Sequence, residues 1–382
     1  MSGILICINE PANAGYAIEP LEIAFYTTAR RLFGVDSRIY LSYHDFSNGY
    51  PRWYKGDNKN LITLKYKSMS AMEFNDLSIY IANNDIEYVL AFDLPVGAEV
   101  CRHFRKGGVK FIFSYWGAPM SSINYGVKIL LKRLQVKLTT HKPDHFIFES
   151  EGMQRTATNG RGINIKNTSV VRLGIDADKY ISVNKSDYAH KLFNIPIRRK
   201  IIFYSGHMEK RKGVDVLIKA ASLLVNSLER DDLHFLICGD RPGEKESFTP
   251  IFEGTDASRY ITFGGYRNDI PELMSSCYAA VIASTGWDSF PRSSLEMAAA
   301  GLPLIVSDIP GLNETIDPET TGLLFTPADY QDLASKIEYI ADDPEVRSLY
   351  STNSTQRIRD QFTLEIQQKN LLNVIKCHIC VT

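Results

Sequence analysis

The sequence lacks a surplus of either charge, because 43 Lys and Arg residues stand against 44 Asp and Glu residues, a formal net charge of -1 over 382 positions. A protein devoted to nucleic-acid binding normally has a strong basic excess, so the bulk charge argues against that class. The chain also has no run of 18 apolar residues, although a transmembrane helix needs about 20. The composition, with 44% hydrophobic residues, is that of a globular protein, and the length predicts two domains at roughly 150 residues each.

The N-terminal segment MSGILICINEP lacks a basic flank, and its apolar stretch is too short for a signal peptide. We therefore expect a buried first strand there and a cytoplasmic protein. Cysteines are few and scattered, and four of the six lie in or beside apolar segments, as buried thiols do. Cys377 and Cys380 form one close pair, but a structural zinc site normally has four ligands. We expect neither a metal site nor disulfides.

Several catalytic signatures are missing as well. The first candidate strand is not followed by G-x-G-x-x-G, and the chain contains no Walker A sequence, no H-E-x-x-H and no G-x-S-x-G. These absences remove most support for a dehydrogenase, a P-loop NTPase, a metalloprotease or an α/β-hydrolase.

Short β-branched or aromatic segments alternate with helical patterns along the chain, which is typical of βαβ units and parallel sheets. The first series of candidate strands covers residues 4–8, 37–41, 88–92, 110–115, 145–148 and 169–173. The second series covers residues 200–204, 234–238, 260–263, 279–283, 303–306 and 322–325. Each series predicts one doubly wound α/β domain, with a polar hinge region between the two.

The near-neutral total conceals a basic segment in the first half of the chain. Residues 100–143 hold nine Lys or Arg and no Asp or Glu. Within this segment, YGVKILLKRLQVKLTT places leucines on one helical stripe, a basic amphipathic pattern that can lie on an anionic membrane. The residues expected to face the membrane are Lys128, Lys132, Arg133 and Lys137. The alternative is a solvated helix that packs its leucines on the first domain.

The segment ASTGWDSFPRSSLEMAAAG follows a candidate strand and predicts a helix start that is free to hold an anion. We expect Ser289 to cap this helix, Pro291 to occupy its first turn and Gly301 to end it. The unpaired N–H groups near Arg292 and Ser293, at the positive end of the helix dipole, suit a phosphate or diphosphate.

Two carboxylates accompany that helix. Asp288 lies just before it and Glu296 lies on its second turn, so both can face the same crevice. Carboxylates in such places usually bind hydroxyl groups of a ribose or another sugar.

The segment SGHMEKRKGVDVLIKAASLL follows the candidate strand IIFY. Gly206 and Gly213 permit a tight strand-to-helix loop, and His207, Arg211 and Lys212 concentrate positive charge in it. A lysine at such a turn can reach a phosphate as a mobile point charge. The alternative, a solvated surface loop, becomes weaker because an anion-ready helix start lies in the same domain.

A glycine-containing loop around Gly15 follows the first candidate strand. Open α/β sheets bind ligands outside the carboxyl ends of their strands, so we expect this loop to face a ligand crevice from the first domain.

Taken together, these segments resemble the retaining glycosyltransferases of family 4, the glycosyl transferases group 1. The similar segments occur in order as GHMEKRKG, FLICGD, FGGYRNDIPELMSSC, WDSFPRSSLEMAAAGLPLIVSD, GLNETI and TGLLF, over about 130 residues. The resemblance implies the GT-B fold, in which two Rossmann-like domains face each other across a nucleotide-sugar cleft. It implies an acceptor-side domain over residues 1–178, a donor-side domain over residues 179–361, and a C-terminal helix over residues 362–382 that packs back on the first domain.

The resemblance also assigns the candidate site residues to groups. The residues expected at the donor diphosphate are Gly15, Gly206, His207, Arg211, Lys212, Arg292 and Ser293. The residues expected at the donor sugar are Trp116, Asp288, Ser289 and Phe290. Glu296 is expected to hold the ribose, and the residues expected beside the base are Gly265, Tyr266 and Arg267.

The implied reaction needs no cofactor and no metal ion, because lysine, arginine and helix dipoles neutralise the diphosphate. The acceptor attacks on the face from which the leaving group departs, and the leaving phosphate oxygen serves as the base. The expected partners are a nucleotide sugar, a glycan or lipid-linked acceptor of surface polysaccharide synthesis, and the inner face of a membrane. Nucleic acid is not expected.

Three positions depart from the family pattern. Asp288 stands where a glutamate is usual, His207 stands in place of a phosphate-binding arginine, and Trp116 stands in place of a sugar-binding histidine. Two other interpretations stay open beside the transferase: a phosphorylase or sugar-nucleotide epimerase, and a non-catalytic module that binds nucleotide sugars.

Overall fold

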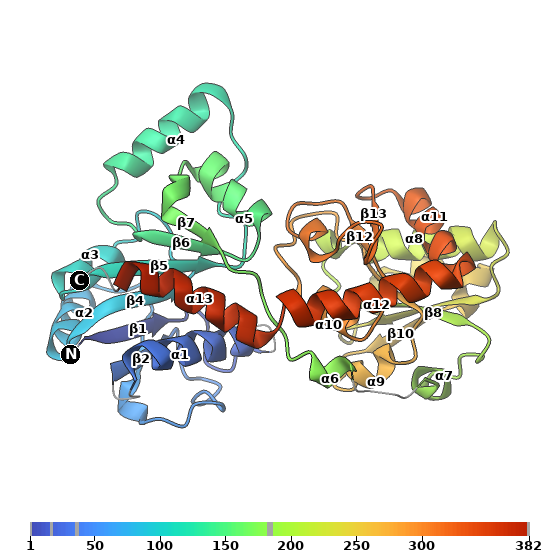
Figure 1. Ribbon diagram of the computed structural model, residues 1–382, viewed down its shortest axis with the longest axis horizontal. Helices are drawn as coiled ribbons and strands as arrows, with labels where there is room; N and C mark the ends of the chain where they lie inside the picture. Colours follow the sequence, from blue (N-terminus) through green and yellow to red (C-terminus); the bar gives the residue numbers. More distant parts are fainter. Residues whose placement is uncertain (1, 16–17, 35–37, 182–185, 380–382) are drawn as a thin grey trace. The chain divides into compact units, whose positions relative to one another are not determined.

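The computed structural model describes residues 2–15, 18–34, 38–181 and 186–379. The chain divides into two compact units (Figure 1), unit 1 with Met1–Arg172 and Leu364–Thr382 and unit 2 with Leu173–Thr363. The boundaries expected from the sequence, after residues 178 and 361, lie near these division points. Ser37, the first residue of one predicted strand, and Cys380 lie outside the described residues.

Unit 1 is built on a seven-stranded parallel sheet in the order β3-β2-β1-β4-β5-β6-β7. Its strands are β1 (Gly3–Cys7), β2 (Ile39–Tyr43), β3 (Leu61–Thr63), β4 (Ile86–Phe92), β5 (Phe111–Trp116), β6 (His145–Phe148) and β7 (Thr168–Val170). Each predicted strand of this series overlaps an observed one. The sequence did not predict β3, because three residues are too few to show an alternating pattern.

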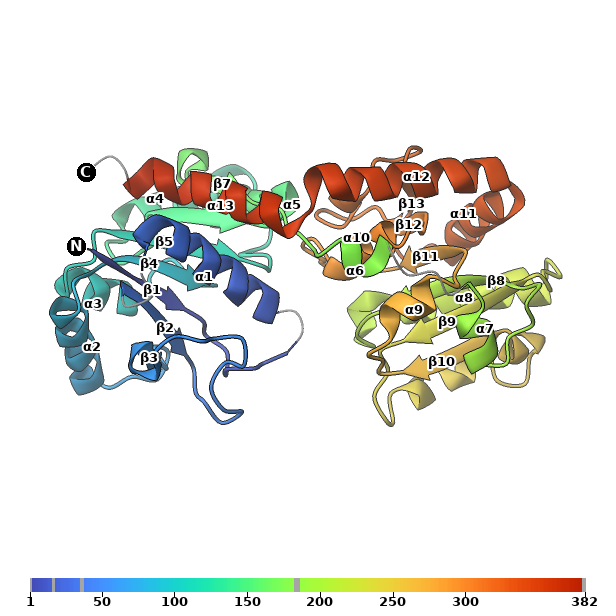
Figure 2. The ribbon, with the colours of Figure 1, turned by 60° about the horizontal axis from the view of Figure 1, so that its bottom comes forward.

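Helices cover both faces of this sheet (Figures 1 and 2). They are α1 (Glu19–Phe33), α2 (Ala71–Asn83), α3 (Val100–Lys106), α4 (Gly126–Leu138), α5 (Glu151–Arg155) and α13 (Leu364–Ile379). The C-terminal helix α13 packs beside α1, although the two helices lie at opposite ends of the chain. Leu371 and Ile375 of α13 are fully buried, so this helix completes the core of unit 1.

Unit 2 is built on a six-stranded parallel sheet in the order β10-β9-β8-β11-β12-β13. Its strands are β8 (Lys200–Ser205), β9 (Leu233–Cys238), β10 (Ile261–Gly265), β11 (Ala279–Ile282), β12 (Leu304–Ser307) and β13 (Gly322–Phe325). Its helices are α6 (Asp178–Ile181), α7 (Tyr188–Leu192), α8 (Val214–Asn226), α9 (Ile270–Met274), α10 (Arg292–Ala299), α11 (Tyr330–Asp342) and α12 (Pro344–Gln361). Both sheets confirm the predicted doubly wound α/β class.

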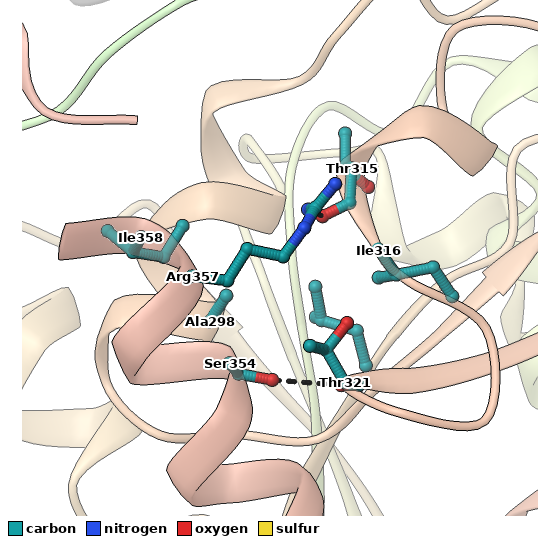
Figure 3. Close-up of a pocket in the computed structure, with 8 residues that line it drawn as sticks. Ala298, Thr315, Ile316, Thr321, Ser354, Arg357 and Ile358 are labelled. Atoms are coloured by element: carbon teal, nitrogen blue, oxygen red, sulfur yellow. Dashed lines mark hydrogen bonds between the residues drawn. The ribbon is translucent and has the colours of Figure 1, made fainter. Parts of the chain in front are cut away.

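Polar side chains join helix α12 to the segment between β12 and β13 of unit 2 (Figure 3). Ser354 Oγ donates a hydrogen bond to Thr321 O at 2.8 Å, and Arg357 Nη1 donates one to Thr315 O at 2.6 Å. The small space between these residues has no room for a water molecule. The close-up therefore shows a packed contact that holds α12 in place.

One buried histidine in each unit makes stability depend on pH. Burial, with a smaller effect of His378, lowers the pKa of His145 to about 4, and burial also lowers the pKa of His234 to about 4. An unfolded histidine has a pKa near 6.5, so the unfolded chain binds more protons between these two values. The native state therefore loses stability as the pH falls from about 6.5 toward 4.

We predict that His145→Gln makes the free energy of unfolding of unit 1 less sensitive to pH in this window. The expected change is on the order of 1–3 kcal/mol between pH 6.5 and 4. Urea unfolding at a series of pH values measures it. The buried His234 of unit 2 offers a control, since His234→Gln should leave the pH dependence of unit 1 as it is. Equal pH dependence in wild type and His145→Gln would contradict the prediction.

Candidate functional site

The strand order of unit 2 reverses between β8 and β11, so the loops after these two strands diverge from one point of the sheet. Open α/β sheets bind ligands at such a point, outside the carboxyl ends of the strands. Gly213 lies in the loop after β8 with a left-handed φ of 67°, and a Cβ there would overlap the carbonyl oxygen of Ala283 after β11. Only glycine permits this approach, which brings the two loops together.

The two loops are joined by a buried ion pair between Lys212 and Asp288. Lys212 Nζ lies 2.8 Å from Asp288 Oδ2, and the side chains are only 14% and 7% exposed. Ser284 Oγ donates a hydrogen bond to the same carboxylate oxygen at 2.8 Å. The structure thus brings together two residues that the sequence assigned to the donor diphosphate and the donor sugar.

The position of Asp288 depends on a glycine that the sequence analysis did not single out. Asp288 and Gly311 form a short parallel β-bridge. A Cβ on Gly311 would overlap the carbonyl oxygens of Ser289 and Asp288, and its φ of 94° is left-handed. The motif GLNETI, which begins at Gly311, was the available signal for this contact.

The predicted cap of α10 is wrong. Pro291 is the N-cap residue and the helix begins at Arg292, so Ser289 does not occupy the N-cap position. The bridge at Asp288 keeps the chain extended and Pro291 has an extended ψ of 130°, so the helix begins three residues after Ser289. Gly301, with a φ of 76°, ends the helix as predicted.

Arg292 and Glu296 lie one turn apart on α10 and face each other. Arg292 Nε lies 3.6 Å from Glu296 Oε1, with both side chains largely buried, and Arg292 Nη1 donates a hydrogen bond to Gly174 O at 3.3 Å. Ser293 beside them is half-buried. Arg292 therefore orients the Glu296 carboxylate at the start of the helix.

Arg211 connects the loop after β8 to the loop after β11. Its guanidinium lies 4.1 Å from the ring centre of Trp287, donates a hydrogen bond to Trp287 O at 3.0 Å and pairs with Glu209 at 2.8 Å. His207 in the same loop is exposed, and Gly206 is half-buried. Trp287 was not predicted as a site residue, because no pattern in the sequence around it indicates that its ring contacts Arg211.

Phe290 lies in the core of unit 2. Its side chain is fully buried, and its ring centre is 5.4 Å from that of Phe362. Any contact of Phe290 with a ligand therefore comes from its backbone.

The loop expected beside the base begins at the end of β10. Gly265 N–H donates a hydrogen bond to Asp240 Oδ1 at 2.8 Å, which fixes this loop to the end of β9. Tyr266 is 69% exposed. Arg267 Nε donates a hydrogen bond to Asp269 at 2.7 Å, and the hydrogen bonds from Arg267 lower the pKa of Asp269 to about 2. The sequence analysis did not identify Asp240, although FLICGD contains it.

In unit 1, Trp116 ends β5 and Gly15 follows β1. The Trp116 indole Nε1 donates a hydrogen bond to Ser114 Oγ at 2.8 Å. Asp93, at the end of β4, has a left-handed φ of 52° and accepts a hydrogen bond from the Gly117 N–H at 3.3 Å. Burial raises the pKa of Asp93 to about 7. The strand order of unit 1 reverses between β1 and β4, so Asp93 lies at its reversal point.

The basic helix of unit 1 is α4, and its leucine stripe is exposed. Leu130 and Leu134 are 60% and 52% exposed, and Val127, Leu131 and Leu138 are exposed too. The alternative in which these leucines pack on the first domain is therefore wrong. The packed face holds the buried Val136 with the half-buried Ile129 and Lys132. The other three basic residues expected at a membrane are exposed, namely Lys128, Arg133 and Lys137.

None of the described helices has the length and apolar character needed to cross a membrane. Among residues 2–15, 18–34, 38–181 and 186–379, no three His, Cys, Asp or Glu side chains gather in a way that suits a metal ion. Cys7, Cys101, Cys238 and Cys277 are buried free thiols, as the sequence predicted.

The two Rossmann-like units define the GT-B class of fold. A crystal structure of a glycosyltransferase from Rickettsia africae ESF-5 aligns with a TM-score of 0.80 at 17% identity, covering 100% of this chain and 99% of that one. Residues 187–357 match the family model described as glycosyl transferases group 1. The resemblance inferred from the motifs of the second half is thereby confirmed.

Two curated relatives each align with between half and two thirds of this chain. One is the UDP-Gal:alpha-D-GlcNAc-diphosphoundecaprenol alpha-1,3-galactosyltransferase of Escherichia coli, 27% identical over 199 residues, or 51% of this chain and 50% of that protein. The other is the N,N'-diacetylbacillosaminyl-diphospho-undecaprenol alpha-1,3-N-acetylgalactosaminyltransferase of Campylobacter jejuni, 28% identical over 242 residues, or 61% and 62%. The alignments thus span between half and two thirds of the length of these relatives.

We predict that Gly311→Ala destabilises unit 2 by roughly 3 kcal/mol or more, because the new methyl group overlaps two carbonyl oxygens and the backbone is left-handed. Gly243→Ala is a matched control: its φ of 92° is nearly the same, but no atom lies within 4 Å of the added Cβ. The control should lose only about 1–2 kcal/mol. Urea unfolding measures the free energy of unfolding of both variants. Equal losses would contradict the prediction, because they would mean that the backbone at Ser289 accommodates the added methyl group.

Proposed function

We propose that the protein is a retaining glycosyltransferase that moves a hexosyl group from a nucleotide-diphosphate sugar to a glycan or lipid-linked acceptor, without a metal ion. One observation carries this proposal. The buried Lys212–Asp288 pair and the start of α10 lie together at the strand-order reversal of unit 2. The family match of residues 187–357 supports a nucleotide sugar as the ligand at this point of the unit 2 sheet.

The donor diphosphate would replace Asp288 as the partner of the Lys212 ammonium group. Lys212 moves its ammonium group onto the diphosphate, and the start of α10 adds the positive end of a helix dipole. Asp288 then loses its counter-ion but keeps the hydrogen bond from Ser284, so its carboxylate stays oriented and accepts a hydroxyl of the donor sugar. Glu296, oriented by Arg292, accepts the ribose hydroxyls.

The reaction balances without a protein nucleophile. The bond between the anomeric carbon and the β-phosphate oxygen breaks, and the acceptor hydroxyl forms the new bond on the same face. The proton of that hydroxyl passes to the leaving phosphate oxygen, and the configuration is retained. Lys212 stabilises the charge that develops on the leaving diphosphate, where a positioned cation contributes most.

Unit 1 would supply the acceptor side, at the cytoplasmic face of a membrane. The exposed leucine stripe of α4 supports this part, because an amphipathic helix with basic flanks binds anionic bilayers. The two curated relatives carry names that specify diphosphoundecaprenol-linked acceptors, which supports a lipid-linked acceptor here.

The donor test compares two lysines of one loop. We predict that Lys212→Met lowers the rate of nucleoside diphosphate release from the donor by about 100-fold or more, because the leaving group loses its cation. Lys210→Met, which changes an exposed lysine two residues away, should keep a near-normal rate. A thermal-shift screen with UDP, GDP, ADP and dTDP sugars selects the donor for this assay.

The products of that assay separate the transferase from the other interpretations. Transfer to an acceptor, or slow donor hydrolysis, supports the proposal. A donor converted to its epimer, release of sugar phosphate, or tight donor binding without turnover would replace it with the epimerase, the phosphorylase or the binding module.

The membrane test uses the leucine stripe. We predict that the double variant Leu130→Ser, Leu134→Ser lowers binding to anionic vesicles by about tenfold or more, because each buried leucine contributes roughly 1.5–3 kcal/mol. Leu349→Ser is a matched control, since Leu349 is 55% exposed on a helix of unit 2. Vesicle co-sedimentation measures the effect, and unchanged binding by the double variant would remove the membrane part of the proposal.

A further inference from the structure

Unit 1 contains a cavity of about 840 Å³ beneath α4. Its walls come from α4, from the segment that leads into β6, and from residues 158–167, which include η4 (Ile165–Asn167). Figure 1 shows where α4 and β6 lie in unit 1, and residues of both elements line the cavity. Its volume is within the range of about 300–1,000 Å³ that small-molecule sites occupy.

Three cationic side chains line this cavity: Arg133, Lys137 and Lys142. None of the lining residues is acidic. Within the described part of the chain, no ion pair is recorded for Arg133 or Lys137. Lys142 Nζ donates a hydrogen bond to Val136 O at 2.6 Å, which fixes its ammonium group at the last turn of α4. The cavity is therefore an electropositive site, and the rest of its polar lining is uncharged amide and hydroxyl groups.

The floor of the cavity is apolar. Val136, Phe146 and Ile163 line it and are all buried. The helical positions of Arg133 and Lys137 place them between this packed side of α4 and the leucine stripe on the opposite side. The cations thus border the cavity on one side and the exposed leucines on the other. A ligand that satisfies both surfaces has an anionic head next to an apolar chain.

We propose that this cavity binds the phosphorylated headgroup of a membrane lipid, with Arg133, Lys137 and Lys142 holding the phosphate while the leucine stripe enters the bilayer beside it. A phosphate accepts several charge-assisted hydrogen bonds at once, and the three cations that line the cavity can donate them. The proposal rests on the membrane part of the proposed function and is independent of the donor site in unit 2. It turns a general attraction to anionic surfaces into recognition of a particular headgroup.

The first experiment uses monomeric lipids in solution. Dihexanoyl phosphatidic acid, kept below its critical micelle concentration, is titrated by calorimetry against the full chain. We expect saturable binding of one lipid per chain, at least about tenfold weaker binding of glycerol 3-phosphate, which has the phosphate without the chains, and no detectable binding of dihexanoyl phosphatidylcholine. Equal affinity for glycerol 3-phosphate would mean a site for a soluble phosphate, and equal affinity for phosphatidylcholine would mean a site without charge recognition. Either result overturns the proposal.

The second experiment separates the cavity from the charge of the helix. Lys137→Gln and Lys128→Gln each remove one positive charge from the exposed surface of α4, but only Lys137 lines the cavity. We expect Lys137→Gln to weaken binding of dihexanoyl phosphatidic acid about tenfold and Lys128→Gln to weaken it less than twofold, because a lost charge-assisted hydrogen bond is specific and a lost surface charge is screened. Equal effects would overturn the proposal in favour of a general electrostatic surface.

A third measurement keeps the two proposals distinguishable. Both variants should keep the wild-type thermal midpoint and the wild-type shift with the nucleotide sugar, since neither residue lies in unit 2. Loss of lipid binding with an intact donor response supports the cavity. Wild-type lipid binding by Arg133→Gln, Lys137→Gln and Lys142→Met together, with an intact donor response, overturns it while the transferase proposal stands.

Discussion

The candidate donor site depends on one close contact, the approach of the Gly213 backbone to the carbonyl of Ala283. Any side chain at position 213 would occupy the space of that carbonyl and push the loop after β8 away from the loop after β11. Lys212 would then move away from Asp288. A buried ion pair is tolerated only where its geometry is good and its remaining groups are hydrogen-bonded. The glycine provides the geometry, and Ser284 provides the additional hydrogen bond.

This arrangement also explains why an ion pair suits a site for a charged substrate. A lysine left alone in a largely buried position would lose much of its solvation, and removing one partner from such a pair typically costs about 3–5 kcal/mol. Asp288 holds the Lys212 side chain in place in the free protein. Under the proposed function, a diphosphate would offer more negative charge than one carboxylate, so it would replace Asp288 as the partner of Lys212 and leave Asp288 to face the sugar.

The sequence predicted the parts of the site that depend on local order. The glycine loop after β8 and the helix after β11 follow directly from strand, loop and helix patterns, and parallel strands bring their carboxyl ends to one edge. The sequence did not predict features in which a residue far along the chain sets the local backbone conformation. Ser289 has the side chain of a helix cap, but the bridge from Asp288 to Gly311 holds the chain extended at that point. Asp240, which holds Gly265, was missed for the same reason.

The count of Lys and Arg residues in residues 100–143 overstated how basic the surface of unit 1 is. Several cations of residues 100–143 are paired with carboxylates just outside that segment: Arg102 with Glu99, Arg105 with Asp144 and Lys110 with Glu87. Within the described part of the chain, the exposed cations of α4 have no such carboxylate partner. A helix can bury only one face against its own unit, and α4 uses the Val136 face for this purpose. Its leucines lie on the opposite face, so only a surface outside unit 1 can cover them. Such a contact would be stabilised by about 25 cal/mol for each Å² of apolar surface removed from water.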